Sequence, residues 1–63
     1  MIPKNIIESL IGVGVYIYIK TINEKFSGTL VRITDEDLAV LEDKYNNYTY
    51  IPISDIDVIT ERR

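Results

Sequence analysis

The sequence contains no cysteine and no histidine. The absence of cysteine excludes a disulfide, a thiolate metal site and a cysteine nucleophile. The absence of histidine removes the commonest general base and the commonest transition-metal ligand. Asp55 and Asp57 are the nearest approach to a paired carboxylate, and nothing around them indicates a pocket that would shift their pKa values. We therefore expect no catalytic residue, no metal site and no cofactor, and we predict that the protein is not an enzyme.

Positive charge and long apolar runs are also scarce. Seven Lys and Arg stand against ten Asp and Glu, which gives a net charge of −3. Proteins that bind duplex nucleic acid through its phosphates are usually basic, so duplex binding is not expected. No run of about 18 apolar residues occurs, so we expect no membrane span. The absence of cysteine fits a cytoplasmic protein.

The chain is short for the amount of apolar surface that it carries. Its 63 residues predict a single domain over residues 1–63, and 46% of them are hydrophobic. A domain of about 60 residues buries only about 60% of its unfolded surface and is marginal alone. Small domains usually gain stability from disulfides, metals or neighbouring subunits. Since disulfides are excluded and a metal is not expected, we predict that neighbouring subunits stabilise the chain and that it is a homo-oligomer.

The N-terminal part predicts a short helix followed by a strand. Pro3 suits the first turn of a helix, and Gly12 is placed to end it. Between them, an apolar stripe at helical spacing is formed by Ile6, Ile7, Leu10 and Ile11. From Val13 to Lys20 the hydrophobic period changes to two. This alternation predicts a strand whose inner face is formed by Val13, Val15, Ile17 and Ile19.

The remainder predicts four more short strands. The second contains Gly28, which indicates a bend or bulge; Phe26 and Leu30 should point inward, with Val31 and Ile33 on the opposite face. Pro52 should lie at a strand end or a sheet edge. The four predicted strands span residues 26–33, 38–41, 48–51 and 56–60. Five strands with brief turns indicate a mainly β fold, a small and strongly bent antiparallel barrel.

This pattern resembles the Sm-like family, which includes the archaeal and eukaryotic Sm proteins and bacterial Hfq. The segment F-S-G-T-L at the predicted bend and L-E-D after the third strand carry the resemblance, through Phe26, Gly28, Leu30, Leu41 and Asp43. The resemblance implies an Sm-like (SH3-like) barrel that forms a ring of roughly five to seven subunits. It also implies that the fourth strand of one subunit pairs with the fifth strand of the next. The expected interface residues are Tyr48, Tyr50, Ile51, Ile53, Val58 and Ile59.

The positions that bind RNA in the family carry different residues here. The family's loop Asp falls on Thr34, its base-stacking aromatic or His on Glu36, and its Met-Asn pair on Asp37 and Leu38. Pro52 stands where the family has an Arg that contacts RNA. The resemblance therefore implies that RNA binding would use Thr34, Glu36, Leu38 and Pro52, and that the uridine pocket is lost or replaced.

Two further features permit more than one interpretation. Tyr45, Tyr48 and Tyr50, beside Asn46 and Asn47, would make a stacking platform for single-stranded bases, or would simply suit an edge strand or subunit interface. The acidic turn at residues 35–37 has the oxygen ligands that Mg²⁺ or Ca²⁺ prefers, but such turns are more often solvated. The sequence thus predicts an Sm-like ring associated with single-stranded RNA. The alternative is a self-assembling or protein-docking ring without RNA.

Overall fold

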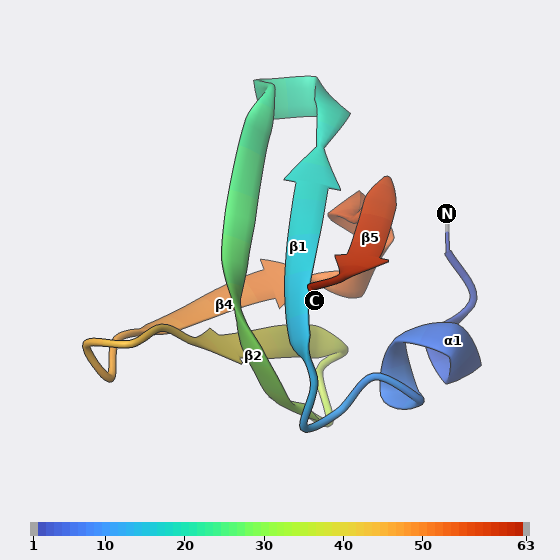
Figure 1. Ribbon diagram of the computed structural model, residues 1–63. Helices are drawn as coiled ribbons and strands as arrows, with labels where there is room; N and C mark the ends of the chain where they lie inside the picture. Colours follow the sequence, from blue (N-terminus) through green and yellow to red (C-terminus); the bar gives the residue numbers. More distant parts are fainter. Residues whose placement is uncertain (1, 63) are drawn as a thin grey trace.

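The computed structural model describes residues 2–62 and confirms a mainly β protein with a short N-terminal helix. The helix and the first two strands are α1 (Lys4–Glu8), β1 (Gly14–Ile19) and β2 (Glu24–Ile33), with the 3₁₀ turn η1 (Lys20–Ile22) between the strands. The rest of the chain forms β3 (Leu38–Glu42), β4 (Tyr48–Pro52), the 3₁₀ turn η2 (Ile53–Asp55) and β5 (Val58–Glu61). Figure 1 shows these elements in sequence colours.

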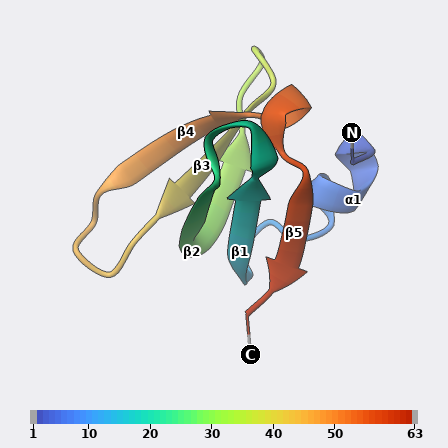
Figure 2. The ribbon, with the colours of Figure 1, turned by 90° about the horizontal axis from the view of Figure 1, so that it is seen from above.

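The five strands form one antiparallel sheet in the order β4-β3-β2-β1-β5. Figure 2 shows the strands side by side in this order, with α1 beside β5. β4 and β5 are the edge strands, and within residues 2–62 no ladder joins them, so the sheet is not closed on itself. The predicted five antiparallel strands are therefore confirmed, and the sheet has two open edges.

One face of the sheet packs on a single hydrophobic core. As the alternation predicts, β1 buries Val15, Ile17 and Ile19. The helix α1 adds Ile7 to this cluster, and the other strands and turns add its remaining buried members, which are Leu30, Ala39, Leu41, Ile51, Ile53 and Ile56. β3 buries Val40 on its other face as well, which confirms a strand covered on both sides.

The N-terminal helix contributes less to the core than its apolar stripe predicts. α1 ends at Glu8, and only Ile7 is fully buried, while Leu10 packs partly on the core. Ile6 and Ile11 are exposed, so only two of the four residues in the predicted apolar stripe pack on the core. After the helix the chain is tied to β2, because Gly12 donates its N–H to the carbonyl of Leu30 at 2.6 Å.

β2 contains the predicted irregularity in two parts. At Gly28 the strand passes so close to β3 that a Cβ would lie 2.8 Å from the carbonyl oxygen of Glu42. Two residues later the register with β3 shifts between Leu30 and Arg32, which leaves Val31 as the extra residue of a bulge. A bulge reverses the alternation that follows it. Ile33 accordingly packs against the core, and the prediction that it lies opposite Leu30 is wrong. Figure 1 shows β4 running across the direction of β1 on the far side of this irregular strand.

The last turn and strand differ slightly from the sequence pattern. Pro52 ends β4 at the sheet edge, as predicted, and η2 follows directly. Ile56 is buried but precedes β5, because its N–H bonds back to Ile53 rather than across a ladder. No helix among the described residues has the length and apolar character needed to cross a membrane.

Candidate functional site

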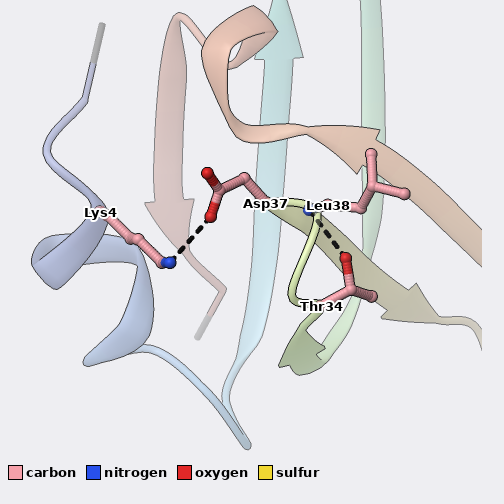
Figure 3. A network of polar contacts seen from close by, with 4 residues as sticks. All are labelled: Lys4, Thr34, Asp37 and Leu38. Atoms are coloured by element: carbon pink, nitrogen blue, oxygen red, sulfur yellow. Dashed lines mark hydrogen bonds and ion pairs between the residues drawn. The ribbon is translucent and has the colours of Figure 1, made fainter.

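The turn between β2 and β3, together with the first residue of β3, carries three of the four family-aligned RNA positions, and its hydrogen bonds define their roles. Thr34 donates its N–H to the carbonyl of Leu38 at 2.9 Å. The N–H of Leu38 donates to Oγ1 of Thr34 at 3.1 Å (Figure 3). The Thr34 hydroxyl and the Leu38 backbone therefore hold the turn together, while Glu36 is exposed beside them.

Asp37 connects this turn to two other parts of the chain. Its carboxylate accepts a hydrogen bond from Nζ of Lys4 on α1 at 2.8 Å, drawn in Figure 3. Its carbonyl accepts the N–H of Ile53 at 3.0 Å. The hydrogen bond and the charge of Asp37 raise the pKa of Lys4 above its usual value. The turn, α1 and η2 thus meet at one place.

A depression of about 480 Å³ lies at this meeting point, lined by Lys4, Glu36, Asp37, Pro52, Ile53 and Ser54. Of the four family-aligned positions, the structure brings Glu36 and Pro52 together here. Thr34 and Leu38 are not among its lining residues. One lysine faces two carboxylates, and that lysine is already paired with Asp37. The depression is therefore poorly suited to a phosphate, because its remaining charge is negative.

The acidic turn does not gather further ligands. Within residues 2–62 no three acidic side chains converge in a way that could hold a metal ion. Asp37 is engaged by Lys4.

The three candidate stacking tyrosines lie at and beside the β4 edge. Tyr48 and Tyr50 are 51% and 52% exposed, and Tyr45, in the turn before β4, is 72% exposed. On β4, Tyr50 pairs with Val40, which pairs in turn with Arg32 on β2. Since opposed residues share a face, the Arg32 and Tyr50 side chains flank the fully buried Val40. Tyr50 therefore has a packing role as well as an exposed surface.

The turn from Asp43 to Asn47 is built around the Asp43 carboxylate. Its Oδ1 accepts the N–H of Asn47 at 3.0 Å and that of Tyr45 at 2.8 Å. These bonds stabilise the charged form, the bond from Asn47 most, and lower the pKa of Asp43. Asn46 takes the left-handed conformation, with φ 65°, as its type allows. This turn joins β3 to β4, between the third and fourth predicted strands, and it presents Tyr45 outward.

A second depression, of about 550 Å³, lies beside this turn. Its lining residues are Ser27, Gly28, Thr29, Glu42, Asp43, Lys44, Tyr45, Asn46 and Arg62. Of these, the sequence pattern singled out Tyr45, with Asn46 beside it, as part of a candidate stacking platform. The sequence pattern favours a solvated tail at Arg62 and allows a flexible contact to nucleic acid. The bond of its N–H to the carbonyl of Gly14, which pairs with Thr29, places Arg62 beside β2 instead.

The expected interface positions divide into two groups. Ile51 and Ile53 belong to the core, and Ile59 packs partly against it, so these side chains mainly stabilise the chain itself. Tyr48, Tyr50 and Val58 are exposed at the two sheet edges. Only this second group presents large side chains outward.

Comparisons of the chain with protein families, with curated proteins and with solved structures find no match.

Proposed function

We propose that this chain is a divergent Sm-like protein that assembles into a ring and associates with single-stranded RNA. The observation that carries the proposal is the strand order β4-β3-β2-β1-β5 after an N-terminal helix. In this order the two strands that the Sm-like resemblance assigns to subunit pairing are both sheet edges. Two residues that carry the resemblance also lie where the Sm-like pattern implies. Gly28 lies at the close approach of β2 to β3, and Asp43 directly follows β3.

The surface at the two edges supports self-assembly. An open strand edge presents unpaired N–H and C=O groups that another chain can pair with. On this chain the edges also carry Tyr48, Tyr50 and Val58. Pairing β4 of one subunit with β5 of the next would satisfy the backbone groups and cover these side chains. Such a heterologous contact, repeated with a rotation that closes, generates a ring.

The proposed RNA association uses surfaces other than the family's uridine pocket. The depression that contains Glu36 and Pro52 has the wrong charge for a phosphate. Exposed tyrosines can stack on bases, and such stacking is tolerant of sequence. Tyr45, Tyr48 and Tyr50 are the exposed tyrosines nearest β4.

A second candidate is a ring that docks a protein partner and binds no RNA. The negative depression favours it, because two carboxylates and an apolar floor of Pro52 and Ile53 suit a basic peptide better than a nucleic acid. Both candidates share the ring and differ in the ligand.

Two measurements test the proposal. Native mass spectrometry of the purified protein should give a closed oligomer, a multiple of the 7.3 kDa chain. Filter binding at low salt should retain short oligo-U or oligo-A. A monomer would overturn the ring. An oligomer that retains neither oligonucleotide would overturn the RNA association and would favour the second candidate, the ring that docks a protein partner.

A further inference from the structure

The second depression lies between β2, the turn after β3 and the residue that follows β5. Its floor is Ser27, Gly28 and Thr29 of β2. One wall is the turn from Asp43 to Asn46, and the other is Arg62, directly after β5.

Arg62 is part of the sheet rather than a loose tail. Its N–H donates to the carbonyl of Gly14 at 2.7 Å, which continues the pairing of β5 with β1. Its guanidinium crosses Gly14 so closely that a Cβ there would lie 3.0 Å from both Nε and Nη2. The missing side chain of Gly14 thus makes room for the guanidinium at the rim of the depression.

The opposite wall carries an aromatic ring and a second cation. Nζ of Lys44 lies 5.2 Å from the centre of the Tyr45 ring. Because the Asp43 carboxylate binds the N–H groups of Tyr45 and Asn47, this turn is held in one conformation. The exposed ring of Tyr45 and the amide of Asn46 are therefore presented together at the rim.

We propose that this depression binds one nucleotide unit of single-stranded RNA, with the base stacked on Tyr45 and a phosphate at Arg62 and Lys44. This proposal rests on the RNA association proposed above and names its site. Each group matches one part of a nucleotide. The Tyr45 ring matches the face of the base, the cations Arg62 and Lys44 match the phosphate, and the Asn46 amide matches the edge of the base. Glu42 and the hydroxyls of Ser27 and Thr29 provide hydrogen-bonding groups for a ribose 2′-hydroxyl.

The charge distribution favours this site over the depression at Glu36. Here two cations, Arg62 and Lys44, accompany two carboxylates, and the Asp43 carboxylate is already occupied by the turn. At Glu36 a single lysine accompanies two carboxylates and is itself paired. A phosphate therefore meets less repulsion beside Arg62.

Fluorescence anisotropy with labelled oligo-U and oligo-A tests the site. Tyr45→Leu should raise the Kd about tenfold, as expected for loss of base stacking, while Tyr45→Phe should bind like the unaltered protein. Arg62→Gln should weaken binding and reduce the slope of log K against log salt by about 0.7, the value for one phosphate contact on a single strand. Replacing RNA by DNA of the same sequence should also weaken binding.

The matched controls are Lys20→Gln, a charge loss on the exposed turn η1, and Lys4→Gln in the other depression. Neither should change the Kd by more than about twofold. If the protein binds RNA but only Lys4→Gln weakens binding, the site is overturned and the RNA association stands. If Tyr45→Leu and Arg62→Gln both bind normally, the site is overturned as well. If the unaltered protein binds no RNA, both proposals fail.

Discussion

The backbone of Glu42 occupies the space that a side chain on Gly28 would need. A Cβ built on Gly28 lies 2.8 Å from the Glu42 carbonyl oxygen, closer than real Cβ contacts. The oxygen belongs to β3 and cannot move without shifting the strand. This close approach explains why β2 has a glycine in its middle.

Gly28→Ala should therefore destabilise the protein by about 1–3 kcal/mol, the usual cost of overpacking a well-packed site. Gly28→Val should cost more. Chemical denaturation followed by circular dichroism measures the change. The control is Gly14→Ala, whose Cβ meets only the end of the Arg62 side chain and which should change stability little. Equal stability of Gly28→Ala and the unaltered protein would contradict the close approach of the strands.

The left-handed conformation of Asn46 makes a prediction about the turn before β4. With φ 65°, a β-branched side chain is strained at this position. Asn46→Val should lower the free energy of unfolding by about 1–2 kcal/mol. Asn46→Gly should be close to neutral, because glycine adopts this conformation readily. Thermal unfolding of the two variants makes the comparison, and a valine variant as stable as the glycine variant would contradict the turn geometry.

Asp43 makes the stability of the same turn depend on pH. Its folded-state pKa lies below the ordinary value because Asn47 and Tyr45 donate N–H groups to the carboxylate. A lowered folded pKa means that the stabilisation is complete above the unfolded pKa of about 3.9 and is lost as the pH falls through the folded value. Asp43→Ala should thus be less stable than the unaltered protein at pH 6, and the difference should shrink below pH about 4. Urea unfolding at several pH values measures it. A difference that does not change with pH would mean that the charged carboxylate is not responsible.

Ring assembly predicts that charge at either sheet edge breaks the oligomer. Val58 is 47% exposed on β5, and Tyr50 is exposed on β4, so neither substitution opens a large cavity in the core. Val58→Asp and Tyr50→Asp should each shift the protein toward monomer, because each places a charge in an apolar contact. Light scattering coupled to gel filtration reports the mass. Lys20→Asp, which adds the same negative side chain on the turn η1 and outside both edge strands, is the control and should leave the mass unchanged. If all three variants keep the mass of the unaltered protein, the subunits meet elsewhere.

Part of the fold follows from local patterns in the sequence. The alternation of β1 identifies its buried face, because a period of two places every second side chain on the core. Gly28 indicates the irregular strand, and Pro52 indicates a strand end, because each residue type has a restricted backbone role. The double-sided burial of β3 follows from its continuous apolar run. These features depend on neighbours in sequence and could be read without coordinates.

The candidate site and the change of side-chain alternation within β2 could not be predicted in this way, because they depend on pairing between distant segments. The bulge at Val31 turns Ile33 inward, and nothing in the run of apolar residues marks the extra residue. Arg62 reaches the depression only because its backbone bonds to Gly14, far away in sequence. Sequence alone determined which segments become strands, through local periodicity and backbone restriction. Tertiary structure decided which side chains meet, since strand register and the space left by glycines arise only when the whole sheet has formed.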